Sequence, residues 1–307
     1  MRFLAALLVL MAGTAGAAEL RVAIVSRTVF FVPLWLAQQK GYVNASIEVY
    51  NNAEKINEDL RSGKVHVAVG TPEAVMIDAY QGGTLRIIAG NAERLPHFII
   101  AKPSIKTLPA LRGARFGVLS LQEGSAYLVH RLMAANGFKP GDYEVLAVGG
   151  APTRWKLLQE GKIDAGLQPF PLSYEAEAAG FTNFGPITQY VQNYLFTTVN
   201  ADSEWTSRND EATVAFLRGL RRGLDHMKRS RDDAVAVAAR ELNTTPVLAE
   251  RALADTAKLQ ILSQDLSVSE PALKGTFDTL VDVGLLPADA RFEPARMVDN
   301  RFLRRLP

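Results

Sequence analysis

Four short segments of this chain recur in the same order further along it, and this repetition constrains the fold more than any other feature. Residues 60–69 (LRSGKVHVAV) resemble residues 158–167 (LQEGKIDAGL). Three further pairs are collinear with this one: 20–26 with 114–120, 40–42 with 136–138, and 47–49 with 143–145. The members of each pair lie 94 to 98 positions apart. Such self-similarity predicts that one supersecondary unit is built twice.

Each copy alternates short strands with helices. In the first copy the apolar run 20–26 predicts a buried strand, and Pro33 begins a helix that ends at Gly41. The second copy repeats this pattern, with strands over 114–119, 143–148 and 163–167 and helices over 125–136 and 152–160. Strands and helices that alternate in this way are typical of a parallel sheet with helices on both faces. We therefore expect an α/β protein with two lobes, each a doubly wound, mainly parallel sheet, and a cleft between them.

The order of these segments also predicts how the chain is divided. We expect a discontinuous first lobe made of residues 19–98 plus 200–307, in which the part after residue 210 is helical. Residues 99–199 would form the second lobe together with the crossover segments. Two connecting segments would then act as a hinge.

The first 18 residues have the pattern of a secretory signal peptide. Arg2 supplies a positive charge, residues 3–11 are apolar, and residues 15–18 (AGAA) form a small-residue cleavage site. The apolar run is too short to anchor the protein in a bilayer. The chain contains no cysteine, so neither a disulfide nor lipid attachment at a cysteine is expected. These features predict an exported, periplasmic protein that is not a lipoprotein.

Neither the charge nor the motifs indicate nucleic-acid binding or catalysis. The formal net charge is +2, and the basic residues are scattered. The histidines lack metal-ligand spacing, and neither a G-x-S-x-G motif nor a P-loop occurs. Asp164 occupies the place that His66 holds in the first copy, and we expect both to be structural. The sequence therefore predicts no enzyme, no metal site and no cofactor.

Small polar residues and glycines follow the predicted strands in both copies. In open parallel sheets a ligand binds beyond the carboxyl ends of the strands, where backbone N–H groups can approach it. Two such sheets that face each other would share one pocket. The candidate ligand-binding residues are Ser26, Arg27, Thr28, Phe30, Asn51, Gly70, Thr71, Asn91, Ser120, Gln122, Ser125, Gly150, Gln168 and Phe170.

Three of these residues suit an acidic group on the ligand. Arg27 directly follows a buried strand, where a guanidinium can clamp a carboxylate or sulfonate with paired hydrogen bonds; a solvent-exposed loop position is the alternative. Thr71 and Ser125 stand at predicted helix starts, where free N–H groups favour an anion, although both can also be ordinary N-caps.

Other side chains have roles that follow from their predicted elements. Phe30 and Phe170 are placed to flank the body of an organic ligand. Trp35 lies on the apolar stripe of its helix and is expected in the core. Arg154 lies inside a predicted helix, and we expect it to face water rather than the cleft.

Residues 32–42 (VPLWLAQQKGY) resemble the P-L-x-x-A-x-x-K-G-Y/F opening of the periplasmic substrate-binding proteins of ABC importers. The similarity is to the group that takes nitrate, alkanesulfonates, taurine and thiamine pyrimidine precursors. Residues 60–68, 105–113 and 158–165 fit later signatures of this group in order, and the resemblance covers about residues 20–200. It implies a type II two-lobed binding protein that closes about a hinge.

The resemblance also implies partners. The protein would act as a monomer that captures a small molecule and delivers it to an ABC permease in the inner membrane, with no nucleic-acid partner. The chain lacks an obvious set of several basic residues for an inorganic anion, so an organic solute, a sulfonate, a carboxylate or a heterocycle, fits better. One enzyme branch of the fold uses a cysteine-rich iron site, which this cysteine-free chain cannot supply. A periplasmic sensor that presents its closed form to a receptor, or a secreted enzyme, are the alternatives.

Overall fold

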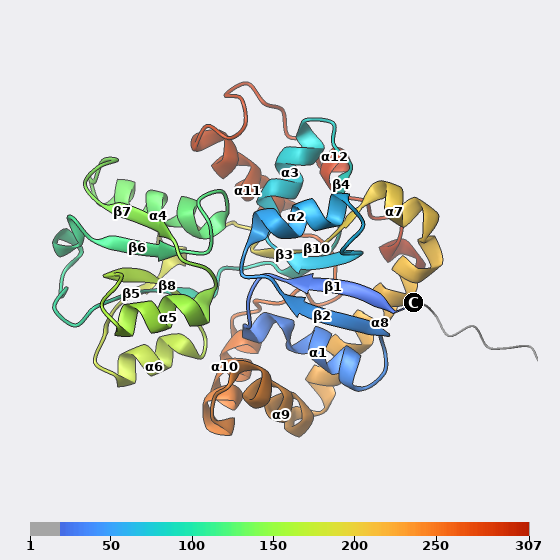
Figure 1. Ribbon diagram of the computed structural model, residues 1–307, viewed down its shortest axis with the longest axis horizontal. Coiled ribbons are helices and arrows are strands. Elements are labelled where there is room, and N and C mark those ends of the chain that lie inside the picture. The colour runs from blue at the N-terminus through green and yellow to red at the C-terminus, as the bar shows by residue number, and fades with distance from the viewer. Residues whose placement is uncertain (1–18, 307) are drawn as a thin grey trace, which may run out of the picture.

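The computed structural model describes residues 19–306, so the predicted signal peptide lies outside the described residues. Two five-stranded sheets form the centres of two lobes that lie side by side (Figure 1). The first sheet has the order β2-β1-β3-β10-β4 and consists of β1 (Leu20–Ile24), β2 (Ala45–Val49), β3 (Val67–Gly70), β4 (Leu85–Ala92) and β10 (Thr197–Asp202). The second has the order β7-β6-β8-β5-β9 and consists of β5 (His97–Ala101), β6 (Arg115–Val118), β7 (Glu144–Ala147), β8 (Ala165–Pro169) and β9 (Thr182–Pro186).

The two sheets have the same internal plan. β1 pairs in parallel with β2 and β3, and β6 pairs in parallel with β7 and β8. In each sheet the fourth strand is antiparallel to both of its neighbours; this strand is β10 in lobe 1 and β5 in lobe 2. The predicted fold class, α/β with two mainly parallel sheets in two lobes, is therefore confirmed.

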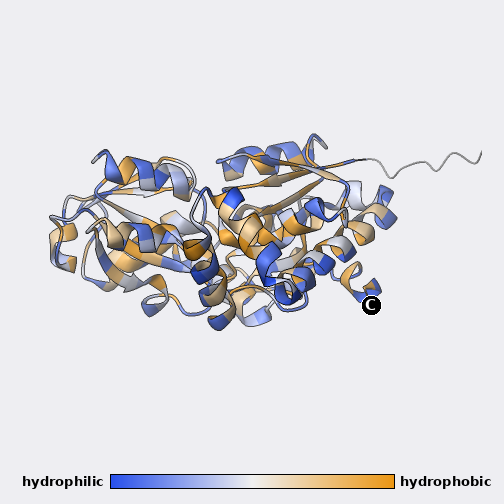
Figure 2. Ribbon diagram, turned by 90° about the horizontal axis from the view of Figure 1, so that it is seen from below, coloured by the Kyte–Doolittle hydropathy of each residue, from blue (hydrophilic) through white to orange (hydrophobic). Residues whose placement is uncertain are grey.

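Helices cover both sheets. Lobe 1 contains α1 (Val32–Gln39), α2 (Ala53–Arg61) and α3 (Glu73–Tyr80), and then the C-terminal series α7 (Ser203–Arg208), α8 (Asp210–Arg229), α9 (Arg231–Leu242), α10 (Pro246–Lys258), α11 (Glu270–Asp282) and α12 (Pro294–Met297). Lobe 2 contains α4 (Gly124–Ala135), α5 (Ala151–Gln159) and α6 (Leu172–Ala178). Short 3₁₀ turns lie at Val29–Phe31, Leu108–Leu111, Ile187–Gln189 and Leu303–Arg305. Apolar residues concentrate on the strands and on the inner faces of the helices (Figure 2).

The chain passes between the lobes twice. Residues 93–96 join β4 to β5, and residues 187–196 lead from β9 to β10. Each passage delivers the antiparallel strand of the lobe that it enters. All of His97–Ala101 pairs within the second sheet, so the first passage ends before residue 97. Two short segments therefore connect two sheets that are otherwise built separately.

An arginine on the first strand of each copy fixes the turn before the third strand. The Arg21 guanidinium donates to the carbonyl oxygen of Gly63 (2.7 Å), and Arg115 donates to that of Gly161 (2.7 Å). Both glycines have a positive φ, 70° and 68°, which a residue with a side chain adopts at a cost. The repeated sequence around these glycines thus encodes the same turn in both lobes.

His66 and Asp164 follow these turns, and both have structural partners as expected. The His66 ring accepts a hydrogen bond from the backbone N–H of Arg21 (3.2 Å) and stacks on Trp205. Asp164 forms ion pairs with Arg115 (2.8 Å) and Lys102 (2.7 Å). The Asp164 carboxylate in lobe 2 thus binds Arg115, as the His66 imidazole in lobe 1 binds Arg21.

We predict that Asp164→Asn destabilises the protein in a pH-dependent way. Arg115, and then Lys102, hold the pKa of the Asp164 carboxyl well below its usual range. Its charge therefore stabilises the folded state above the ordinary carboxyl pKa of about 4, and this contribution is lost as the pH falls. At pH 7 the free energy of unfolding should drop by about 1–3 kcal/mol, and the difference from wild type should shrink toward pH 3 in urea titrations.

Asp278→Asn is the matched control, because the Asp278 carboxylate pairs only on the exposed face of α11 with Lys274. A loss for Asp164→Asn that is equal to that of the control, or that stays constant between pH 7 and pH 3, would contradict the prediction.

Candidate functional site

A cavity of about 40 Å³ lies between the lobes at the carboxyl ends of both sheets. It has room for about one to three water molecules, so the lobes are closed on each other. Its lining comes from both lobes and from the crossover segments: Val25, Ser26, Thr28, Phe31, Thr71, His97, Leu119, Glu123, Ser125, Gly150, Ala151, Arg154, Phe196 and Thr197.

The two antiparallel strands explain why residues from the crossovers reach this cavity. Because β5 and β10 run against their neighbours, their first residues lie at the edge where the parallel strands end. His97 pairs with Pro169, the last residue of β8, and Thr198 pairs with Gly70, the last residue of β3. The cavity is therefore lined by strand ends and by strand beginnings.

Polar contacts between the lobes hold the cavity closed. Three of them join different parts of the two lobes: Ser120 to Glu54 (2.6 Å), Arg131 to Asp282 (2.5 Å) and Tyr174 to Asp255. These contacts lie on α2, α11 and α10 of lobe 1, so they surround the cleft rather than close it at one point.

Gly150 permits a close approach of the two lobes. A Cβ added to Gly150 would lie 2.5 Å from Ser26 Oγ and 2.9 Å from Asn51 Oδ1, both in lobe 1. The preceding Gly149 has a φ of 96°, which turns the chain toward lobe 1. Closure to this extent requires glycine at position 150.

Several polar atoms around the cavity are buried without a hydrogen-bond partner. They are Ser26 Oγ and Thr28 Oγ1 in lobe 1, and His97 Nδ1 and Arg154 Nε in lobe 2. A buried polar atom that lacks a partner costs about 1–3 kcal/mol, so such atoms are rare in folded proteins. Four of them around one cavity mark a place where a bound molecule supplies the missing partners.

Arg154 is the positive charge of the site. Its side chain is only 3% exposed, and its two Nη atoms donate to the carbonyl oxygens of Gly149 (3.2 Å) and Leu167 (2.8 Å). Burial lowers the pKa of the guanidinium to about 10, opposed by the nearby Glu123, so Arg154 stays charged at neutral pH. These two carbonyl contacts fix its position and leave Nε without a partner.

Two glycines in neighbouring strands lie next to this arginine. Gly117 lies on β6 and Gly166 on β8, and added Cβ atoms there would lie 3.5 and 3.8 Å from the Arg154 side chain. Glycine inside a strand often marks such a close approach. We expected Arg154 to face water, which is wrong, because the carbonyl groups of Gly149 and Leu167 hold its guanidinium inside the protein.

His97 is a neutral hydrogen-bonding group. Burial and the neighbouring charge of Arg154 lower the pKa of its imidazole to about 3. The ring stands edge-on to Phe196, with centroids 4.7 Å apart. At neutral pH it can donate from one nitrogen and accept at the other.

A buried carboxyl group, that of Glu123, lies at the start of α4. Glu123 is 2% exposed. The Ser125 hydroxyl donates to the Glu123 carboxylate and accepts from the backbone N–H of Leu119 (3.0 Å). Burial raises the pKa of Glu123.

The interpretation of Thr71 and Ser125 as N-caps is wrong, since Pro72 and Glu123 hold those positions.

Five of the fourteen predicted ligand-binding residues line the cavity. These are Ser26, Thr28, Thr71, Ser125 and Gly150. Two more lie beside it at the interface of the lobes: Asn51 is close to Gly150, and Ser120 donates to Glu54.

The other predicted residues lie behind the cavity or outside it. Phe30 packs edge-on against Phe196, Asn91 donates to Thr197 Oγ1 (2.9 Å), and Phe170 stacks on Tyr174. Gly70 and Gln168 are buried in their strands, and both amide atoms of Gln168 lack a partner. Gln122 is exposed.

Arg27 also lies outside the cavity. Its side chain is 49% exposed and pairs with Glu241 on α9 (2.5 Å). Arg27 is therefore a solvent-exposed loop arginine, which is the alternative to a clamp on the ligand. The buried cation comes from Arg154 instead.

Sequence reasoning missed several other lining residues, above all His97, Arg154 and Thr197. For Arg154 the sequence holds no decisive local signal, because one of the carbonyl groups that hold its guanidinium, that of Leu167, lies on another strand. For His97 and Thr197 no local signal exists, because their position depends on the direction in which β5 and β10 enter their sheets.

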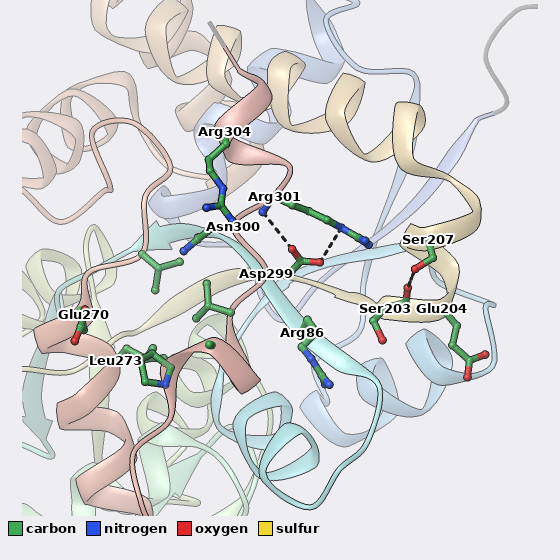
Figure 3. Close-up of a pocket in the computed structure, with 14 residues that line it drawn as sticks. Arg86, Ser203, Glu204, Ser207, Glu270, Leu273, Asp299, Asn300, Arg301 and Arg304 are labelled. Atoms are coloured by element: carbon green, nitrogen blue, oxygen red, sulfur yellow. Dashed lines mark hydrogen bonds and ion pairs between the residues drawn. The ribbon is translucent and has the colours of Figure 1, made fainter.

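A larger hollow of about 730 Å³ lies on lobe 1 near the C-terminus (Figure 3). In Figure 3 Arg301 points toward Asp299, with which it pairs (3.0 Å), and Ser207 donates to the backbone of Ser203 (2.7 Å). Within residues 19–306, no buried polar atom without a partner belongs to this hollow. We therefore place the candidate site between the lobes.

Comparisons with known proteins agree with the fold. The family model described as NMT1/THI5 like matches residues 29–234. No curated protein matches the sequence.

Within the part of the chain that the structure describes, no helix is long and apolar enough to cross a membrane.

Three solved structures illustrate the similarity. The ligand-binding component of an ABC-type import system from Staphylococcus aureus has a TM-score of 0.78 and 12% identity, covering 94% of this chain and 99% of that one. The periplasmic nitrate-binding protein of Synechocystis PCC 6803 has a TM-score of 0.72 and 13% identity, covering 89% and 83%. The alkanesulfonate-binding protein of Xanthomonas axonopodis pv. citri has a TM-score of 0.68 and 16% identity, covering 89% and 94%. At these identities the likeness is one of fold.

We predict that Gly150→Ala keeps the lobes from closing fully, because the added methyl group would meet Ser26. Small-angle X-ray scattering should give a larger radius of gyration than for wild type, with little change in the circular dichroism spectrum. Thr153→Ala, at an exposed position of the same helix, should match wild type. Equal radii for wild type and Gly150→Ala would show that position 150 does not limit closure.

Proposed function

Because the chain belongs to the NMT1/THI5-like family, we propose that it is the solute-binding component of an ABC importer. It captures one small molecule between its lobes and delivers it to a permease in the inner membrane. Residues 1–18 direct its export and are cleaved, and the absence of cysteine means that it is not anchored as a lipoprotein. It acts in the periplasm as a monomer and carries out no chemistry on its ligand.

One observation carries this proposal: four buried polar atoms without partners surround a cavity that exists only between the lobes. Two come from lobe 1 and two from lobe 2. A ligand that bonds to both sets favours the closed state over the open one, which is how a small molecule can drive closure.

The charges and walls of the cavity favour a compact organic anion. Arg154 supplies one fixed positive charge, and its free Nε can donate to a carboxylate or sulfonate oxygen. Val25, Phe31, Leu119 and Phe196 form apolar walls that a bare inorganic anion would leave without contacts. An alkanesulfonate-binding protein and a nitrate-binding protein are among the similar structures, and the apolar walls favour the former kind of ligand.

The hinge of this motion consists of the two passages between the lobes. Residues 93–96 and 187–196 are the connections between the two sheets. We propose that residues 19–92 with 197–306, and residues 97–186, move as two bodies about these segments. Opening would expose the cavity to solvent and admit the ligand.

A thermal-shift screen with matched arginine variants tests the proposal. Sulfonates, carboxylates and nitrogen heterocycles of no more than about six heavy atoms form the panel, since the closed cavity is small, and a ligand should raise the melting temperature of wild type. Arg154→Gln should weaken its binding by about 10–100-fold, because a charge-assisted hydrogen bond is lost, whereas Arg27→Gln should bind as wild type does.

Two outcomes would count against the proposal. One is a panel in which no compound raises the melting temperature of wild type. The other is a ligand whose affinity falls as much in Arg27→Gln as in Arg154→Gln, since the binding site would then not be the cavity between the lobes.

A further inference from the structure

Beside the cavity, two carboxyl groups from opposite lobes are buried close together. Glu73 is the first residue of α3 in lobe 1 and is 1% exposed. Glu123 directly precedes α4 in lobe 2 and is 2% exposed. The lobes meet here so closely that a Cβ added to Gly124 would lie 2.5 Å from Glu73 Oε1.

The pair has few partners. The Tyr194 hydroxyl, from the second passage, donates to Glu73 Oε1 (2.6 Å), while Glu73 Oε2 is buried without a partner. Thr71 also hydrogen-bonds to Glu73, and the Ser125 hydroxyl donates to Glu123. Within residues 19–306, no ion pair includes either carboxyl group.

The charged and titratable groups around the pair come from every element that packs against it. Apart from the two glutamates they are Tyr194 from the second passage, Tyr127 from α4, Glu54 from α2 and Arg154 from α5. Of these, only Arg154 is a cation, and it acts on Glu123 rather than on Glu73. Glu73 therefore lies among acidic and phenolic groups.

Two carboxylates cannot both stay charged in such a dry place, so one of them holds a proton. Burial, reinforced by repulsion from Glu123, raises the pKa of Glu73 to about 8, although the Tyr194 hydrogen bond opposes this. At neutral pH Glu73 is thus protonated while the lobes are closed.

The burial of Glu73 depends on lobe 2. Gly124 and Glu123, which cover it, belong to lobe 2 and leave when the lobes separate. We propose that closure of the lobes is coupled to the uptake of one proton by Glu73, so that the protein captures its ligand more tightly as its surroundings become more acidic. The statement about capture rests on the proposed function; the statement about closure does not.

The direction of the pH effect, and the pH range in which it occurs, follow from the pKa of Glu73 in the open and closed states. In the open state Glu73 faces water, and its pKa returns toward the usual 4.5, below the closed-state value of about 8. Between these values the closed state binds more protons, so each unit of rising pH lowers the closed-to-open ratio by up to about tenfold. Above this range both states are ionised, and below it both are protonated, so the dependence ends.

The absence of cysteine makes closure measurable without a ligand. Cysteines introduced at Ser62 and Lys139, which are exposed positions on different lobes, can carry spin labels whose separation reports opening. Electron–electron resonance distances of the ligand-free protein are recorded from pH 5 to pH 9. We expect the closed fraction of wild type to fall as the pH rises.

Three variants assign the effect. Glu73→Gln mimics the protonated side chain and should stay closed at pH 9. Tyr194→Phe removes the donor that stabilises the charged form, so its transition should move to higher pH. Glu58→Gln, at an exposed position on α2, should behave as wild type does.

The proposal is overturned if the distances of wild type do not change between pH 5 and pH 9, or if Glu73→Gln follows the same pH profile as wild type. If Glu73→Gln does not fold, the proposal is overturned instead when the Tyr194→Phe variant opens at the same pH as wild type does. Because no ligand is present, these results are independent of the thermal-shift screen. Failure here leaves the proposed function standing, and failure of that screen leaves proton-coupled closure intact.

Discussion

The approach of two lobes over a cleft lined with polar groups is the constraint on which the rest of this structure depends. Closure removes water from Ser26, Thr28, His97 and Arg154 without giving their free atoms a protein partner. Burial without a hydrogen bond is costly, so the closed state needs compensation from a bound molecule. The ion pair of Arg131 with Asp282 contributes at the exposed edge of the interface, where such contacts are worth little.

The way the chain crosses between the lobes makes this approach possible. Each crossing ends in an antiparallel strand, β5 or β10, whose first residue reaches the cavity. Because the short segments that connect the lobes supply Phe196 to the site and lead directly into His97 and Thr197, ligand contacts and lobe movement involve adjoining residues. A change at the site can therefore alter the hinge directly, without a long path of coupling.

The charge balance of the cleft depends on how dry it is. Arg154 keeps its charge although it is buried, because two backbone carbonyl groups accept its hydrogen bonds. Within residues 19–306 no ion pair includes Glu73 or Glu123, and burial raises the pKa of each. A closed cleft in which Glu73 is protonated carries one negative charge fewer than an open cleft in which Glu73 is ionised. The state of the lobes and the charge of the site are thus linked.

The sequence by itself determined the repeated unit, the two mainly parallel sheets and the family, since strand and helix patterns, the glycines of the turns and the segment 32–42 are local features. It also located the loops at the strand ends, which is why Ser26, Thr28 and Gly150 were found. Only the tertiary structure decided which arginine is buried. Arg27 follows β1 and Arg154 lies on α5; the Arg27 side chain pairs with Glu241 on α9, whereas carbonyl groups of Gly149 and Leu167 hold the Arg154 guanidinium. The direction of a side chain depends on space that distant segments leave free, and no local pattern records that space.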